Sequence, residues 1–215
     1  MAIGWERSFR SHPAPNTAMT TIPATNPYPW PYDGDLDPGR LALVVCGAQR
    51  AIGAAVPDAG SALATIDRVA RHVRGLGSAV VWVRHGGQAT ARPTFLPTVR
   101  TPSWELCVTP APGDLVVDAA GWDACFSSTL DHDLRRLGRT HLLLAGLASE
   151  ITVDSTVRTL NDQGYECLVL TDACAPVDPD LGAHAHASLT MSGGIFGALG
   201  TSDALLSALT RTETP

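Results

Sequence analysis

The sequence predicts an α/β fold: three layers, with a mostly parallel sheet covered by helices on both faces. Short apolar runs alternate with longer stretches whose apolar residues recur every three or four positions. Strands that alternate with helices form parallel sheets with right-handed crossovers. The length of 215 residues suits a single domain.

Five apolar runs are predicted as strands, at residues 41–46, 79–83, 115–117, 141–145 and 166–170. Helical periodicity marks residues 61–75, 127–137 and 150–163, and a final helix is expected from about residue 202. Ser61 and Ser202 are the predicted N-terminal caps of the first and last of these helices. Because ligands bind beyond the carboxyl ends of parallel strands, the segments that follow the strands are where a site is expected.

The remaining segments give the domain organisation. Residues 1–25 are expected to be a disordered extension, and residues 26–215 a single domain, while either Met1 or Met19 fits as the start of the protein. The prolines and aromatic residues of 26–37 predict an extended arm that docks on the domain. Residues 86–115 contain five prolines and are predicted to be a lid-like loop.

Composition excludes several classes of function. The formal net charge is −6 and no arginine cluster offers a phosphate track, which argues against nucleic-acid binding. No apolar run is long enough for a membrane span, and no secretory signal is visible, so a cytoplasmic protein is expected. All 15 basic residues are arginine, so no lysine ammonium is available for catalysis.

No cofactor or metal is predicted. The five cysteines have no metal-ligand spacing and read as reduced, partly buried thiols. His184 and His186 form the one close histidine pair, and no third ligand lies near them in the sequence.

Several motifs in their order and spacing resemble the isochorismatase-like superfamily, also called cysteine hydrolases. The motifs are LALVVCGAQ, VVWVRHGG, VVDAAGWDACFSSTLDHDLRRLG, HLLLAGLASEITVDSTVRTLNDQGYECLVLTDAC and SGGIFGALGTSDALLSAL. The segments NDQGYECLVL, GGIFGA and PYPWPYDG are similar to the branch of amidohydrolases that act on biuret and ureidoacrylate-type substrates. The resemblance covers roughly residues 26–210 and implies an isochorismatase-like hydrolase fold.

The resemblance also implies a reaction and the positions that perform it. In the family a cysteine attacks an amide or ureido carbonyl, an aspartate transfers the proton, and a lysine holds the charges in place. Backbone N–H groups meet the oxyanion beside a non-proline cis peptide. These positions fall here on Gly47 for the aspartate, Ala119 for the lysine and Thr152 for the cysteine, with the cis peptide at Leu147–Ala148. None of the three reacting side chains is present.

A substitute nucleophile is not favoured. Thr152 would need an adjacent base, and Gly47 and Ala119 supply none. Cys46 is expected to point into the packing of the sheet, and Cys125 to be a pocket wall or core residue. We therefore expect no cysteine-dependent amide hydrolysis, because losing every member of such a unit leaves mainly binding.

The pocket itself is predicted to persist. Its expected lining, besides the triad positions, is Gln49, His85, Trp122, Asp123, Cys125, Leu147, Ala148, Ser149 and Glu150. Two interpretations stay open. The pocket serves a different, non-cysteine reaction or binds a small amide- or ureido-like or other planar metabolite, with His85, Asp123 or Glu150 as weak acid or base. Alternatively the chain is an inactive pseudoenzyme that serves as a partner or scaffold for a paralogous or pathway enzyme. A homo-oligomer, dimer or tetramer, is expected in either case.

Each of these side chains also has a purely structural interpretation. His85 can be a structural hydrogen-bonding residue, Glu150 can favour the start of a helix through its dipole, and Trp122 can be a packing aromatic. Asp172 is interpreted as a turn residue after its strand.

Overall fold

The fold is known from a computed structural model, which describes residues 20–87 and 99–212. Six strands form one sheet in the order β3-β2-β1-β4-β5-β6, and every neighbouring pair is parallel. The strands are β1 (Leu41–Cys46), β2 (Ala79–His85), β3 (Leu115–Ala119), β4 (His141–Leu147), β5 (Glu166–Ala175) and β6 (Ala198–Gly200). The α/β prediction is confirmed, and β6 is a strand that the sequence analysis did not anticipate.

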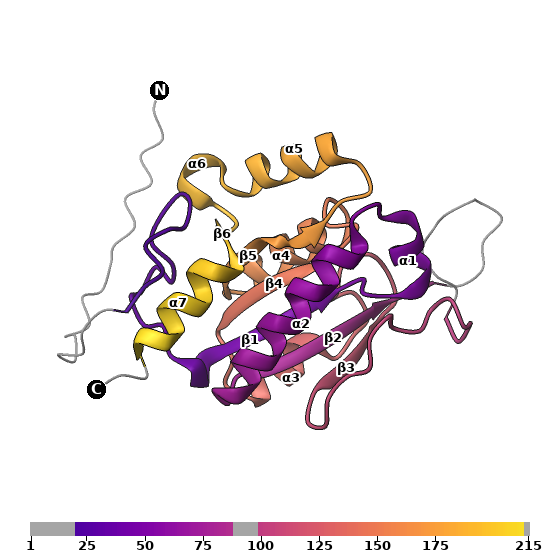
Figure 1. The fold of residues 1–215 in the computed structure, drawn as a ribbon, viewed down its shortest axis with the longest axis horizontal. Coiled ribbons are helices and arrows are strands. Elements are labelled where there is room, and N and C mark those ends of the chain that lie inside the picture. The colour runs from indigo at the N-terminus through magenta and orange to yellow at the C-terminus, as the bar shows by residue number, and fades with distance from the viewer. Residues whose placement is uncertain (1–19, 88–98, 213–215) are drawn as a thin grey trace.

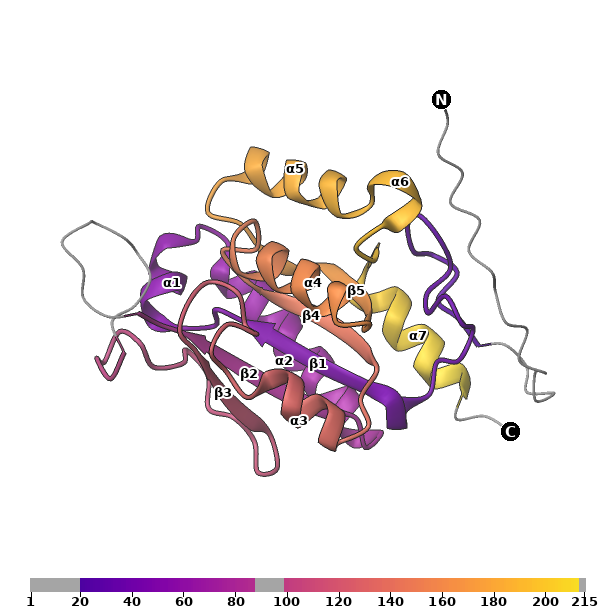
Figure 2. The same cartoon turned by 180° about the vertical axis from the view of Figure 1, so that it is seen from behind.

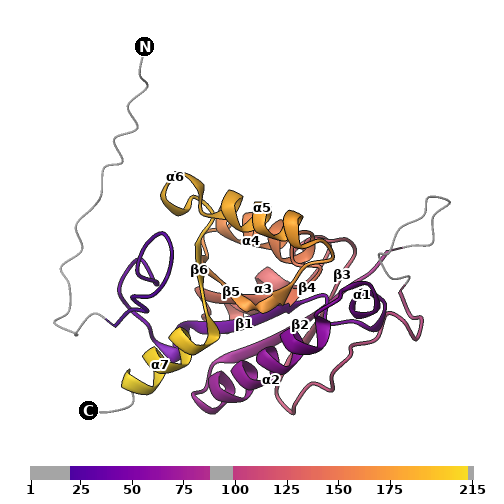
Figure 3. The ribbon, with the colours of Figure 1, turned by 45° about the horizontal axis from the view of Figure 1, so that its top comes forward.

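Helices cover both faces of the sheet, so the structure has three layers (Figures 1 and 2). The long helix α2 (Ala59–Gly75) and the final helix α7 (Ser202–Thr212) pack on one face. The opposite face carries α3 (Leu130–Arg136), α4 (Thr152–Asp162) and, outside α4, α5 (Pro179–Leu189). Two short helices, α1 (Arg50–Ala55) and α6 (Met191–Gly194), complete the fold (Figure 3).

Burial follows the pattern of a parallel sheet covered twice. Every residue of β1 and β4 is buried, because these are central strands with helices on both faces. In α2 the side chains Ile66, Val69 and Val73 are fully buried against the sheet. In α4 the equivalent face is Val153, Val157 and Leu160, as the periodicity predicts.

Several helix boundaries differ from the predictions. Helix α2 begins at Ala59 after Asp58, two residues before the predicted cap Ser61. Helix α3 begins at Leu130, because residues 120–129 form turns instead of a helical start. The cap expected at Ser202 is wrong: its N–H and hydroxyl donate to Asp172, which lies within β5 and is therefore not a turn residue.

The N-terminal boundary also needs correction. The structure describes residues from 20 onward, and Ile22 is buried and exchanges backbone hydrogen bonds with Trp30. The expectation that residues 1–25 are disordered is therefore wrong for residues 20–25, and residues 1–19 lie outside the described part. Trp30 is fully buried, and Asn26 pairs with Leu199 of β6, so residues 20–37 lie against the sheet.

The structure describes the predicted loop 86–115 at its start, up to residue 87, and again from residue 99 onward. Residues 103–107 run antiparallel to residues 48–51, with hydrogen bonds from Arg50 N to Glu105 O and from Cys107 N to Ala48 O. Trp104 in this segment is buried. No helix in residues 20–87 and 99–212 is long and apolar enough to span a membrane.

Candidate functional site

The three positions to which the family resemblance assigns the triad lie where β1, β3 and β4 end, which we call the carboxyl edge of the sheet. Gly47 directly follows β1, Ala119 is the last residue of β3, and Thr152 is the first residue of α4 after the loop that leaves β4. Parallel pairing aligns the ends of these strands across β2, so the fold itself brings the three positions to one edge.

Gly47 lies directly against the start of α4. Its φ is +69°, and a Cβ atom placed on it would lie 3.3 Å from Thr152 Cγ2 and 2.8 Å from the carbonyl oxygen of Leu147. Contacts below 3.0 Å do not occur for real Cβ atoms, and the carbonyl belongs to the main chain. This backbone therefore accepts glycine at position 47 and has no room for a side chain.

Thr152 is fully buried and its hydroxyl is already engaged. Oγ1 donates to the carbonyl oxygen of Leu147 at 2.8 Å and approaches that of Ala148 at 3.3 Å. Its own carbonyl accepts from Thr156 Oγ1 at 2.7 Å, and this hydroxyl in turn accepts from the N–H of Ala124. The Thr152 hydroxyl is thus a structural donor within the first turn of α4.

Backbone N–H groups beside Thr152 are also used internally. The N–H groups of Ile151 and Thr152 both donate to the carbonyl of Ala148, and that of Ser149 donates to the carbonyl of Ala175. An oxyanion hole requires N–H groups that are free to meet a developing charge. These three groups are committed to the fold.

The expected cis peptide at Leu147–Ala148 is not present. In the part of the chain that the structure describes, the cis peptides are Asn26–Pro27 and Trp30–Pro31. Ala148 instead has a φ of +52°, a conformation that few non-glycine residues adopt. This turn directs the Leu147 carbonyl toward Gly47 and Thr152, as their contacts with its oxygen require.

Apolar side chains cluster at the same edge. Leu147 and Ala148 are fully buried together with Ile52 of α1, and Trp122 packs against this group from the loop after β3. Trp122 was expected either to pack or to touch a ligand, and the structure gives it a packing contact. Part of the space beyond Gly47 is therefore occupied by hydrocarbon.

Gln49 and His85 are joined across the ends of β1 and β2. The carboxamide of Gln49 donates to the carbonyls of His85 (3.0 Å) and Trp104 (2.8 Å), and it accepts from the His85 N–H (2.7 Å). Both residues are fully buried. The predicted pocket residue Gln49 therefore holds β1, β2 and the loop around Trp104 together.

His85 presents an unpaired ring nitrogen. Its Nδ1 lies 3.0 Å from the carbonyl oxygen of Gly121, so Nδ1 must carry the proton and Nε2 the lone pair. Nε2 is buried and has no partner among the described residues. Burial lowers the pKa of His85 to about 4, with smaller opposing effects from Gly121 and the nearby Asp123 carboxylate. The ring is therefore neutral near pH 7.

Asp123 and Cys125 organise the loop after β3. The carboxylate of Asp123 accepts from Thr159 Oγ1 at 2.8 Å and from the N–H of Cys125 at 2.9 Å. Cys125 is half-buried against the core under α4, which agrees with its interpretation as a wall or core residue. Asp123 is thus held in place by α4 and lies near His85.

Ser149 and Glu150 each have a buried side-chain oxygen without a partner among the described residues. Ser149 Oγ is buried without a partner among the described residues. Glu150 Oε1 accepts from the N–H groups of Val177 and Asp178, and its Oε2 is buried and unpartnered in the same part of the chain. Glu150 therefore anchors the turn after β5, a role that the sequence did not indicate.

The cysteines near this edge are not ionised. Burial raises the pKa of Cys46 to about 12, and it raises the pKa of Cys125 as well. Cys46 is fully buried on the sheet face under α3 and α4, as predicted, and its thiol points toward Thr156. Since the thiolate is the reactive form of a cysteine, neither residue has the ionisation that a nucleophile needs.

One cluster at this edge was missed by the sequence analysis. The Arg84 guanidinium lies 3.9 Å from the centre of a ring of Trp104 and pairs with Asp118 at 2.7 Å and Glu105 at 3.2 Å. Arg84 and Asp118 are the next-to-last residues of β2 and β3, so attention to the carboxyl ends of the strands could have found them. Within residues 20–87 and 99–212 no group of three potential metal ligands is found.

Comparison with known proteins identifies the family and the fold. The Isochorismatase domain family matches residues 41–203. The ureidoacrylate amidohydrolase RutB of Methylobacterium radiotolerans is 28% identical over 182 residues, covering 67% of this chain and 70% of that enzyme. RutB of Variovorax paradoxus is 41% identical over 64 residues, which span 30% of this chain and 25% of that enzyme.

Among solved structures, a cysteine hydrolase from Pseudomonas syringae pv. phaseolicola superposes with a TM-score of 0.73 at 18% identity, covering 82% of this chain and 95% of the other. This likeness shows the fold. Because the family match spans well over half of the 215 residues and includes every strand of the sheet, the chain belongs to the isochorismatase family.

Proposed function

We propose that this family member does not hydrolyse amides through a cysteine, and that its carboxyl edge binds a small amide- or ureido-type molecule instead. The hydrogen bond from Thr152 Oγ1 to the Leu147 carbonyl carries the first half of the proposal. A hydroxyl that donates to a main-chain carbonyl, with no base beside it, is not an activated nucleophile. The positions of the proton-transfer and charge-holding groups are Gly47 and Ala119, which have no ionisable side chain.

Buried polar atoms without partners support the binding half. His85 Nε2 and Ser149 Oγ are both buried and unpaired in the described part of the chain. Leaving such a group unsatisfied costs about 1–3 kcal/mol. A neutral ligand with N–H donors and a carbonyl acceptor would satisfy an imidazole lone pair and a hydroxyl, and amide and ureido groups have both.

The first experiment measures catalysis. We expect no ammonia release from biuret or ureidoacrylate by the native chain. The triple variant Gly47→Asp, Ala119→Lys, Thr152→Cys is expected to stay inactive, because the Cβ of the new aspartate would lie only 2.8 Å from the Leu147 carbonyl oxygen. If the native chain does release ammonia, the Thr152→Val variant distinguishes two causes. Activity that is kept in this variant would show hydrolysis by another route, and activity that is lost in it would make Thr152 a nucleophile. Either result contradicts the proposal.

The second experiment measures binding by calorimetry with biuret as the probe. His85→Asn keeps a donor toward Gly121 and removes the free lone pair, so it is expected to abolish binding. His132→Asn is the matched control, because His132 is exposed on α3. Binding that is absent in the native chain, or equal in His85→Asn, overturns the binding half and leaves the catalytic half untouched.

A second candidate function is a non-catalytic subunit that assembles with an active family enzyme. Large apolar side chains exposed around α5 and α6 favour it: Leu181, Met191 and Ile195 are each more than half exposed. Co-purification of the tagged chain from its native host tests this function. A homo-oligomer, as the sequence analysis expects, with no second protein would count against it.

A further inference from the structure

Helix α5 is apolar on its inner side and largely apolar on its outer side. It packs on α4 with the buried residues Gly182 and Leu189 (Figures 1 and 2). Its exposed positions are Pro179, Asp180, Leu181, Ala183, His184 and Ala187. A surface helix normally carries polar residues on its outer side, and a helix that is apolar all round is normally covered all round. The outer side of α5 therefore has the composition of a contact surface.

The segment that contains α5 and α6 is free of charge. Between Asp180 and Asp203 the sequence has no aspartate, glutamate, arginine or lysine, although charged residues make up 17% of the whole chain. Residues 197, 198 and 200 of this segment are buried, but much of α5 and α6 is exposed. Nucleic acids and anionic lipid headgroups are bound through basic side chains, so neither is favoured as the occupant of this surface.

Large apolar side chains extend the surface beyond the end of α5. Met191 and Ile195 are both about half exposed, and the Ile195 N–H donates to the Met191 carbonyl at 3.1 Å, which places them in one turn. The segment of residues 20–37 lies beside this turn (Figures 1 and 3), since a Cβ atom on Gly194 would lie 2.6 Å from the Tyr28 ring. The Tyr28 ring meets that of Tyr32 edge-on, with centres 5.4 Å apart.

We call this surface the apolar face, and it consists of Tyr32, Leu181, Ala183, Ala187, Met191 and Ile195. Within residues 20–87 and 99–212 six large apolar side chains are exposed, and four of them belong to this face. Single exposed apolar side chains need no explanation, whereas a group of them marks an interaction site.

Tyr32 is held in place before any partner binds. Its N–H donates to the Glu166 carboxylate at 3.2 Å, and the Tyr28 hydroxyl donates to the same oxygen at 3.1 Å. The Tyr32 side chain itself is 69% exposed. An aromatic side chain on an ordered backbone loses little conformational freedom on association, so Tyr32 is suited to anchor a protein contact.

We propose that the apolar face is the surface through which two copies of this chain associate about a two-fold axis. In a two-fold contact the same surface meets itself, so a charge near the axis faces its own copy and repels it. A surface without charges in its interior avoids this repulsion and is complementary to itself. A stable interface takes about 20–30 residues from each side, so α5 alone is too short, and α6 and residues 27–32 take part.

This proposal is independent of the carboxyl edge, because no residue of the apolar face belongs to the expected pocket lining. The second candidate function gives the same face to a different protein, and the experiment separates the two occupants.

The test is sedimentation velocity of the full-length chain over a range of micromolar concentrations. The native chain is expected to sediment as a dimer. A native chain that stays monomeric at every concentration overturns the proposal. Co-sedimentation of such a monomer with phosphatidylcholine vesicles would identify a lipid surface as the occupant, and a stable complex with another protein would identify a different subunit.

Variants locate the interface. Met191→Glu and Ile195→Glu are each expected to raise the dissociation constant of the dimer at least tenfold, while Met191→Leu keeps it within about twofold. Val116→Glu is the matched control, since Val116 is an exposed apolar residue on β3, outside the apolar face. Circular dichroism checks that each variant is folded, which is expected because the altered side chains are exposed. An assembly that both Glu variants leave intact, or one that Val116→Glu dissociates instead, would place the interface elsewhere and overturn the proposal.

Discussion

Thr152 donates its hydroxyl hydrogen to the carbonyl oxygen of Leu147 over 2.8 Å, and the same oxygen lies 2.8 Å from where a side chain on Gly47 would begin. One main-chain carbonyl therefore constrains two of the three triad positions. Glycine at position 47 leaves room for the Leu147 carbonyl, and the Thr152 hydroxyl donates a hydrogen bond to the same carbonyl.

The first prediction concerns this fit. Gly47→Ala is expected to lower the free energy of unfolding by about 1–3 kcal/mol, because alanine is strained at positive φ and its Cβ meets the Leu147 carbonyl. Gly164→Ala is the control for strain alone, since Gly164 has a φ of +91° with no atom within 4 Å of an added Cβ. Chemical denaturation of both variants measures the difference, and equal losses would refute the close contact.

The second prediction concerns the hydrogen bonds that the Gln49 carboxamide makes with the main chain of His85 and Trp104. Gln49→Leu is expected to cost about 3 kcal/mol or more of unfolding free energy, because three buried main-chain groups lose their partner. Gln163→Leu serves as control, since Gln163 is exposed. A Gln49 variant as stable as the control would mean that these hydrogen bonds do not stabilise the carboxyl edge of the sheet.

The third prediction is a pH dependence. The pKa of His85 is lowered by burial from 6.5 to about 4, so between these values the unfolded chain binds a proton that the folded chain does not. Stability should therefore rise with pH across this window and fall as the pH drops from 6.5 toward 4. Protonation of His85 is expected to account for about 3 kcal/mol of this change in the free energy of unfolding.

Other histidines act in the same direction, since burial also lowers the pKa of His141 and His186. The measurement is therefore the difference between native protein and His85→Asn, by denaturation at pH 7 and at pH 4.5. A parallel loss of stability in both proteins would contradict the assignment to His85.

The fourth prediction concerns thiol reactivity. Burial raises the pKa of all five thiols, and Cys107 is the cysteine whose side chain is exposed. A disulfide reagent at pH 8 is expected to label one thiol rapidly in the native protein, and none in Cys107→Ser. Rapid labelling of Cys46 or Cys125 would restore the possibility of a substitute nucleophile.

The sequence alone was sufficient for the layers of the fold. The apolar runs at 41–46, 79–83 and 141–145 became central strands β1, β2 and β4, because burial on both faces leaves a continuous apolar signal. It also placed Gly47, Ala119 and Thr152 at one edge, because strand ends in a parallel sheet coincide. Strand β6 and helix α5 escaped detection, since a three-residue strand and a helix with little apolar periodicity leave weak patterns.

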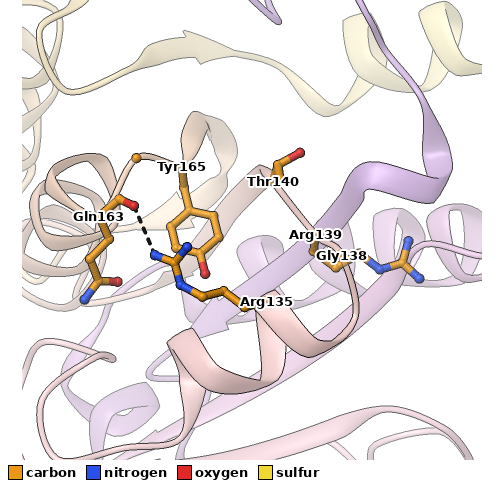
Figure 4. Close-up of a pocket in the computed structure, with 7 residues that line it drawn as sticks. Arg135, Gly138, Arg139, Thr140, Gln163 and Tyr165 are labelled. Carbon is orange, nitrogen blue, oxygen red and sulfur yellow. Dashed lines mark hydrogen bonds between the residues drawn. The ribbon is translucent and has the colours of Figure 1, made fainter.

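What only the tertiary structure decided is the state of that edge. The direction of the Leu147 carbonyl depends on the φ of Ala148, which no residue type at 147 or 148 predicts. The partners of Gln49, Asp123 and Glu150 lie between 27 and 55 residues away, apart from one local bond of Asp123. Likewise, the hollow lined by Arg135, Gly138 and Tyr165 at the start of β4 and β5 (Figure 4) exists because two loops that enter neighbouring strands meet in space. Residue types set which chemistry is available, and the packing of distant segments sets which atoms remain free to perform it.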